Sequence, residues 1–142
     1  MIRLATEADV KGLAKLMGEL GYPTTEKDME QRFKKINANP LYRTIVAEID
    51  GSIVGMVGMI VGYRYENNED YIRIVALVVD SKYRKKGIGK NLIEKAEEWA
   101  INQGIKTLVL NSGNRVVRND AHQFYVHNGF EGRATGFYKE LD

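Results

Sequence analysis

The stretch "DSKYRKKGIGKNL", Asp80 to Leu92, decides how the chain folds, because a strand must turn into a helix there. The apolar run "IRIVALVV" leads into it, and the amphipathic segment "LIEKAEEWA" continues from it. Glycines and cations gather between the two: Arg84, Lys85, Lys86, Gly87, Gly89 and Lys90. Unpaired N–H groups in the first turn of a helix attract anions, so the stretch suits a phosphate. Taken alone, it suits an ordinary helix start with solvated cations equally well.

Two well-known phosphate motifs do not fit these residues. A P-loop requires Ser or Thr after its lysine, but Asn91 follows Lys90. A dinucleotide-binding fingerprint requires a third glycine, and Leu92 stands in its place. That fingerprint is also expected after the first strand of a parallel sheet, whereas several predicted strands precede Gly87. Kinase and dehydrogenase functions are therefore disfavoured.

The chain before this stretch predicts a short strand and two helices. "IRLA" alternates like a strand, and Thr6 with Asp9 forms a capping box before apolar positions at helical spacing. Gly21 is placed to end this first helix. Thr25 with Asp28 repeats the capping pattern before a second helix, which ends before the loop "NANP".

Three strands are expected next. "RTIVAEI", the pair Asp50-Gly51 and "SIVGMVGMIVG" predict a hairpin, since Asp-Gly suits the tight turn between twisted strands. The glycine-rich arm, 52–62, marks either a dimer edge or a bulge. The third strand, "YIRIVALVV", is apolar enough to predict burial on both faces and a central place in a sheet.

The remaining elements alternate between helix and strand. An apolar face predicts a helix from Ile88 to Ala100, closed by Gly104, and "IKTLVL" predicts a strand. A short helix closed by Gly129 and a final strand, "FEGRATGFYKEL", complete the order. We therefore expect an α/β (α+β) fold in one domain, residues 1–142, with a mixed, mostly antiparallel central sheet flanked by helices.

Composition narrows the class of protein. The 142 residues are 44% hydrophobic and 28% charged, which is typical of a soluble globular domain. No cysteine is present, which excludes a thiol nucleophile and a cysteine-ligated metal. No membrane span or secretory signal is recognisable, so we expect a cytoplasmic protein. The net charge of only +2 disfavours nucleic acid as a partner, although "YRKKGIGK" alone would suit a basic binding module.

Two stretches together resemble the GNAT superfamily of acetyl-CoA-dependent N-acetyltransferases. In "VVDSKYRKKGIGKNL", Arg84, Gly87 and Gly89 match the family's Arg/Gln-x-x-Gly-x-Gly/Ala signature for the CoA pyrophosphate. "NDAHQFYVHNGF", Asn119 to Phe130, resembles the family's later Asn, Ala, Tyr and Gly-Phe pattern. The expected order of elements also matches the GNAT-like acyl-CoA N-acyltransferase fold, so the resemblance spans nearly the whole chain.

The resemblance implies a role for particular residues. The backbone of Leu77, Val78 and Val79 would pair with the pantetheine arm, and a backbone N–H near Val79 would stabilise the oxyanion. Asn119, one residue nearer the tyrosine than the commonest family spacing, would hydrogen-bond the pantetheine. Tyr125 would protonate the departing thiolate, although it also fits a core aromatic. The pyrophosphate would be held by Arg84, Lys85, Lys86, Gly87, Ile88, Gly89 and Lys90.

The implied reaction is direct transfer of the acetyl group to a primary amine of a small molecule or peptide, in a ternary complex. Many family members place a carboxylate as general base on the third long strand, but Val75 and Ala76 stand there. We assign no general base, and an acyl-CoA-binding sensor without turnover is the alternative. No metal is expected, because two histidines without a nearby carboxylate pattern do not make a site. A homodimer is possible.

Overall fold

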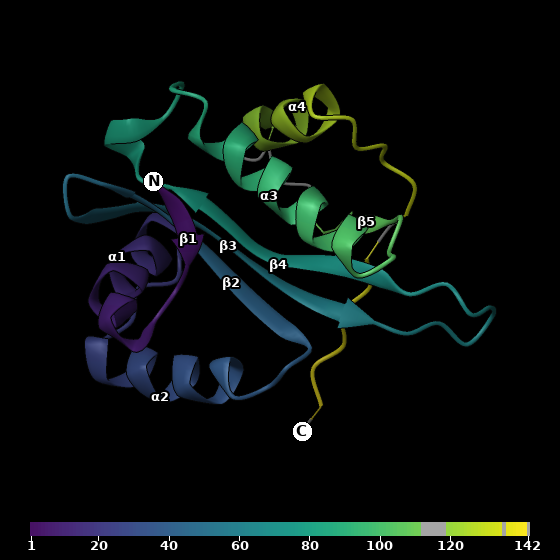
Figure 1. Ribbon diagram of the computed structural model, residues 1–142, viewed down its shortest axis with the longest axis horizontal. Helices are drawn as coiled ribbons and strands as arrows, with labels where there is room; N and C mark the ends of the chain where they lie inside the picture. The colour runs from purple at the N-terminus through teal and green to yellow at the C-terminus, as the bar shows by residue number, and fades with distance from the viewer. Residues whose placement is uncertain (112–118, 135, 142) are drawn as a thin grey trace. The chain divides into compact units, whose positions relative to one another are not determined.

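The computed structural model describes residues 1–111, 119–134 and 136–141, which divide into two compact units, Met1–Val109 and Leu110–Asp142. The strands of the described residues form one sheet in the order β1-β2-β3-β4-β5 (Figure 1). The pairs β1–β2, β2–β3 and β3–β4 are antiparallel. The strand bounds are β1 Ile2–Leu4, β2 Tyr42–Ile49, β3 Ser52–Gly62, β4 Tyr71–Val79 and β5 Leu108–Leu110.

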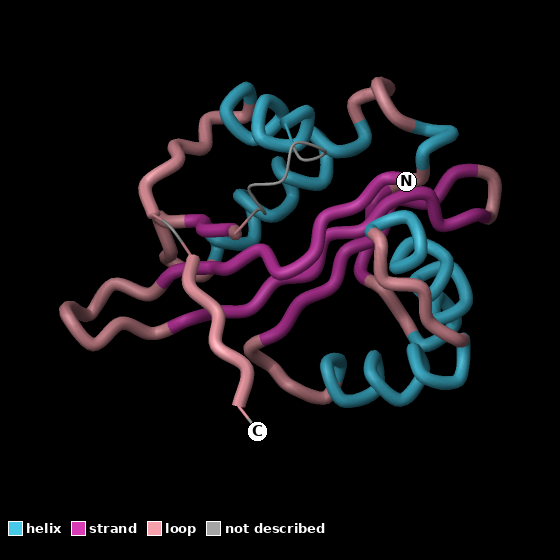
Figure 2. The backbone as a smooth tube through the Cα atoms, turned by 180° about the vertical axis from the view of Figure 1, so that it is seen from behind, coloured by secondary structure: helices cyan, strands magenta, loops and turns pink. Residues whose placement is uncertain are grey.

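Helices cover both faces of this sheet in the first unit (Figure 2). α1 (Val10–Leu20) and α2 (Glu26–Asn37) lie on one face, and α3 (Ile88–Asn102) lies on the other (Figure 1). Two short 3-10 turns, η1 (Glu7–Asp9) and η2 (Ser81–Tyr83), precede α1 and α3. In the second unit, α4 spans Asn119–His127. The expected mixed, mostly antiparallel sheet with flanking helices is thus confirmed.

The face under α1 and α2 holds a continuous apolar core. Three neighbouring strands each contribute one buried member, and the members in α1 and α2 follow helical spacing. They are Val10, Leu13, Leu16, Met29, Phe33, Val46, Met56 and Val78. The opposite face packs against the apolar stripe of α3: Ile88, Leu92, Ile93, Ala96, Trp99 and Ala100.

The predicted hairpin and helix ends are confirmed by the backbone. Asp50 and Gly51 have φ of 51° and 80°, the positive values that a tight two-residue hairpin turn requires. Thr25 caps α2, because its side chain accepts a hydrogen bond from the Asp28 N–H at 3.1 Å. α1 ends at Gly21 with φ of 103°.

Two expectations about strands were wrong, and one open alternative was decided. β3 lies between β2 and β4, so the glycine-rich strand is not an edge; the alternative, a bulge, is confirmed, because register shifts affect both of its pairings. β4 is not buried on both faces, since Val75 is 50% exposed. The structure forms no strand within 130–134 and 136–141. Every described residue after Phe130 is exposed, so the alternating apolar pattern of this segment buries no side chain there.

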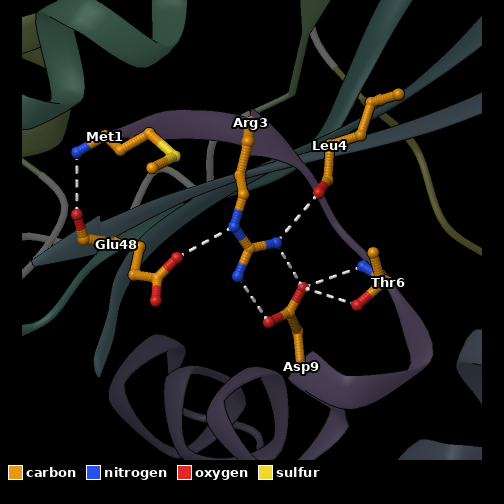
Figure 3. A network of polar contacts seen from close by, with 6 residues as sticks. All are labelled: Met1, Arg3, Leu4, Thr6, Asp9 and Glu48. Atoms are coloured by element: carbon orange, nitrogen blue, oxygen red, sulfur yellow. Dashed lines mark hydrogen bonds and ion pairs between the residues drawn. The ribbon is translucent and has the colours of Figure 1, made fainter. Parts of the chain in front are cut away.

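A polar network ties β1 to the start of the first helix and to β2 (Figure 3). Arg3 donates to both carboxylate oxygens of Asp9 at 2.8 Å and, through Nε, to Glu48 at 2.9 Å. The Thr6 N–H donates to Asp9 at 2.8 Å, as the predicted capping box requires. The hydrogen bonds from Arg3 lower the pKa of the buried Asp9 carboxyl.

We expect Asp9→Asn to lower the free energy of unfolding near pH 7 by about 2–3 kcal/mol, because it leaves Arg3 without its two-point partner. A lowered folded pKa means that the carboxylate stabilises the fold above its unfolded pKa of about 4, and this stabilisation is lost as the pH falls through the folded value. Urea denaturation at several pH values measures the difference.

Glu48→Gln is the matched control, since Glu48 is more exposed and accepts one bond from Arg3. It should cost no more than about 1 kcal/mol. Equal losses for the two variants, or a loss in Asp9→Asn that stays the same at acid pH, would contradict this account of the network.

Candidate functional site

A bulge marks the middle of β4. Gly58 of β3 pairs with Ala76, but the next residue, Met59, pairs with Ile74, so Val75 is the extra residue. Such a bulge bends the strand and increases its twist. The end of β4, Leu77–Val79, stays in register with β3 through Val57, Met56 and Gly55.

The same end of β4 has a strand neighbour on one side only. The Ile72 N–H, near the start of β4, donates to the Thr107 carbonyl at 2.9 Å, just before β5. With a rise of roughly 3.3 Å per residue, the three residues of β5 cover only about a third of β4. Within the described residues, Leu77–Val79 therefore present an edge opposite β3 that no strand pairs.

The chain leaves this edge through a turn with two left-handed residues. After η2, Lys85 has φ of 63° and Gly87 has φ of 81°. Gly87 is the N-cap of α3, and a Cβ placed on it would meet nothing within 4 Å. Glycine is thus required here for backbone conformation, while open space is left in front of the helix.

The first turn of α3 offers backbone N–H groups. The Asn91 N–H donates to the Gly87 carbonyl at 3.0 Å, which starts the helical pattern. The N–H groups of Ile88, Gly89 and Lys90 precede this bond and have no intrahelical acceptor. Ile88 buries its side chain under the helix, whereas Lys85, Lys86 and Lys90 are exposed. This arrangement can hold a doubly charged anion.

Arg84 points back toward the strand and α1. Its Nε donates to the Val79 carbonyl at 3.2 Å, and its Nη2 lies 3.8 Å from the Glu19 carboxylate. Glu19 also accepts a hydrogen bond from the Ser81 hydroxyl at 3.2 Å. Arg84 is 55% exposed, so its guanidinium can turn toward an anion at the helix start.

Asp80 holds the start of the turn. This buried carboxylate accepts from the Lys82 N–H at 2.9 Å and lies 3.6 Å from Lys15 Nζ. The hydrogen bond from Lys82, together with the charge of Lys15, lowers the pKa of Asp80. The sequence reasoning missed Asp80, Lys15 and Glu19. Asp before "SKY" is a recognisable capping signal, but the α1 contacts join residues more than 60 positions apart.

The structure brings the predicted anion-binding residues together. Arg84 to Lys90 form one turn at the start of α3, directly after the Leu77–Val79 edge. Asn119 and Tyr125 lie in α4 of the second unit, and the Asn119 side chain is outside what the structure describes. Tyr125 is half-buried, with its ring edge-to-face with Phe124 at 5.8 Å and with Phe130 at 6.0 Å. These ring contacts fit the alternative of a packed aromatic, and the catalytic role of Tyr125 stays a prediction.

Two other features, a metal site and a membrane-spanning helix, are absent from the described residues. The described side chains contain no group of three His, Asp or Glu residues that could hold a metal ion. None of the described helices combines the length and the apolar character needed to cross a membrane.

Comparison with known proteins identifies the family. Residues 10–130 match the profile of the acetyltransferase (GNAT) family. The chain belongs to this family. The matched range covers the β4 edge, the turn at Gly87 and α4, and it extends across both units.

Individual GNAT proteins resemble the chain over most of its length. A GNAT family acetyltransferase from Staphylococcus aureus is 37% identical, with a TM-score of 0.86, and the match covers 99% of this chain and 98% of that one. Human N-acetylaspartate synthetase is 32% identical over 79% of this chain but only 34% of its own length. Salmonella typhimurium aminoalkylphosphonate N-acetyltransferase is 30% identical over 75% of this chain and 66% of its own. The chain thus spans about a third of the human relative.

We expect Gly87→Ala to lower the free energy of unfolding by about 1–2 kcal/mol, because alanine is strained at a φ of 81°. Gly18→Ala in α1 is the control, since its Cβ would also meet open space but no positive φ is required. That variant should be neutral or more stable by up to about 1 kcal/mol. Urea denaturation compares them, and similar effects at the two positions would contradict the requirement for glycine at 87.

Proposed function

We propose that this chain transfers the acetyl group of acetyl-CoA directly to a primary amine within a ternary complex. The observation that carries the proposal is the left-handed turn at Gly87, which opens the start of α3 beside a strand edge that has no partner strand among the described residues. Family membership supports the same function, because GNAT acetyltransferases use acetyl-CoA as co-substrate.

The residues fit the two chemical parts of CoA. A diphosphate needs several N–H donors, nearby cations and room for its oxygens, and the turn from Arg84 to Lys90 offers all three. The pantetheine arm carries amide groups, which can pair with the backbone edge at Leu77–Val79 as an added strand would. Bound in this way, acetyl-CoA supplies an activated thioester.

The proposed chemistry places one reaction step on Tyr125. As the amine nitrogen bonds to the acetyl carbon and the carbon–sulfur bond breaks, the Tyr125 hydroxyl would give its proton to the leaving sulfur and later regain one from water. A backbone N–H near Val79 would stabilise the oxyanion. Asn119 would hold the pantetheine. Phe124 and Phe130 support this role by fixing the Tyr125 ring through edge contacts.

The proton of the attacking amine has no carboxylate acceptor at the bulge. Val75 and Ala76 stand there, so the amine must react as the neutral species or release its proton to water. Positioning of the amine against the thioester would then account for most of the rate acceleration. Two relatives are named for compounds whose carboxylate or phosphonate groups accompany the nitrogen, so such amines belong among the acceptors tested.

Thiol release from acetyl-CoA tests the activity directly, and the absence of cysteine from the chain keeps its background low. With a panel of primary amines, Tyr125→Phe should lower kcat by at least about 100-fold while leaving acetyl-CoA binding unchanged in calorimetry. Tyr138→Phe, at an 87% exposed tyrosine of the same unit, should have no effect.

The outcomes separate the two functions compatible with this site. Full activity in Tyr125→Phe would remove this residue as the acid, and no binding of acetyl-CoA at millimolar concentration would overturn the proposal. Binding without thiol release from any amine would favour an acyl-CoA sensor, the function consistent with Val75 and Ala76 in place of a carboxylate.

Glu19→Gln should strengthen acetyl-CoA binding by about 3-fold, because the Glu19 carboxylate attracts Arg84 and repels the diphosphate. Glu98→Gln is the control: this glutamate pairs with Lys95 within α3 at 3.3 Å. Calorimetric titration at low salt measures both affinities. An unchanged or weaker affinity in Glu19→Gln would show that Arg84 takes no part in holding the diphosphate.

A further inference from the structure

The sheet face that carries the α1 and α2 core continues past it toward the β3–β4 loop, at the opposite end of β4 from η2 (Figure 1). Along β4 this face carries Val78 in the core, then Ala76, then Arg73, then Tyr71. The register places Ala76 beside Gly58, Arg73 beside Ile60 and Tyr71 beside Gly62. These residues form a floor, which we call the bulge floor.

The centre of the bulge floor is small and apolar. A Cβ on Gly58 would lie 3.8 Å from Val75 Cγ2 and 3.8 Å from Ala76 Cβ, so both side chains lie on the face of Gly58. Val75 is 50% exposed. A Cβ on Gly58 would also lie 3.5 Å from Met56 Cε, so small and apolar groups cover this part of the floor and provide no negative charge to attract a protonated amine.

Arg73 supplies positive charge beside these apolar residues. It is half-buried and, among the residues the structure describes, its side chain makes neither a hydrogen bond nor an ion pair. A half-buried guanidinium without an acidic partner has five donors for water or a ligand. Arg73 precedes Val75 by two residues, about 6–7 Å along the strand.

A second arginine extends the positive charge. Arg64 stacks over the Tyr71 ring with its guanidinium carbon 5.0 Å from the ring centre, and the ring covers Gly62. Arg64 Nε is buried without a hydrogen-bond partner. The nearby loop acids Glu66, Glu69 and Asp70 form no ion pair with either arginine in the described part of the chain.

From this arrangement we propose that the acceptor is a primary amine that also carries a carboxylate or phosphonate group, bound by Arg73 with support from Arg64. The proposal rests on the proposed function, which brings the amine to the bulge. Arginine matches the planar or tetrahedral oxygens of such anions through paired N–H donors. A polyamine or aminoglycoside would instead meet two cations and no carboxylate at the floor.

The same charges bear on the missing base. Binding of the acceptor's anion to Arg73 would hold the nitrogen a few bonds away from the guanidinium. Orientation by the anion would then contribute to the rate, while the amine proton leaves to water, because no carboxylate stands at Val75 or Ala76.

Matched acceptors test the class with the same thiol-release assay. β-Alanine and aminomethylphosphonate should each have a kcat/KM at least about 10-fold above that of β-alaninamide and of spermidine, since two-point charged hydrogen bonds are lost in the latter pair. Comparing the first two separates a carboxylate-binding from a phosphonate-binding site. Higher activity with spermidine or β-alaninamide would overturn the proposal.

Arginine variants locate the effect. Arg73→Gln should raise KM for the preferred anionic acceptor about 10- to 100-fold, leave β-alaninamide within about 2-fold and leave acetyl-CoA binding unchanged, whereas Arg73→Lys should keep part of the preference. Arg43→Gln is the matched control: Arg43 is half-buried with an unpartnered Nε, but it stacks over Trp99 on the opposite face. If Arg73→Gln keeps the anion preference, or Arg43→Gln abolishes it, the assignment is wrong.

Failure of the activity and failure of the acceptor class are distinguishable. If acetyl-CoA binds but no amine is acetylated, the proposed transfer fails, and calorimetric titration of β-alanine and aminomethylphosphonate into the CoA-loaded protein tests the floor alone. Binding that Arg73→Gln abolishes and Arg43→Gln leaves intact supports the anion site. No binding of either compound at millimolar concentration overturns it.

Discussion

The close packing of α3 against β3 determines where the glycine turn before α3 lies. A Cβ on Gly55 would be 3.2 Å from Ile88 Cγ2 and from Leu92 Cδ1, so the helix rests almost directly on the strand backbone. Because Ile88 is the first residue of α3, this contact also places the left-handed Gly87 at the end of β4. A larger residue at 55 would displace the first turn of the helix and with it the N–H groups that face an anion.

The bulge at Val75 divides β4 into two parts with different roles. Beyond it, Leu77–Val79 present a backbone edge beside the Gly87 turn, which suits the CoA arm. Before it, Arg73 and Tyr71 belong to the bulge floor, which suits the proposed acceptor. One extra residue would therefore let a single strand serve both proposed substrates, since the bend separates the edge from the face.

Polar contacts join α1 to this strand and turn. Asp80 attracts Lys15, and Glu19 attracts Arg84 and accepts from Ser81, so three contacts connect the helix to η2 and to the residues on either side of it. At the other end, the Arg3–Asp9 pair anchors the start of the same helix to β1 (Figure 3).

The sequence by itself determined the order of elements, the hairpin at Asp50-Gly51 and the glycine turn before α3, because these follow from local capping, turn chemistry and periodicity. Its final strand was wrong, since an apolar pattern is informative only where a neighbour buries it. The tertiary structure alone decided the bulge at Val75, the ion pair of Arg84 with Glu19 and the place of Arg73 beside the bulge. Strand register and long-range contacts leave no signal in the local sequence, because the segment "RIVALVV" is compatible with more than one register against its neighbour.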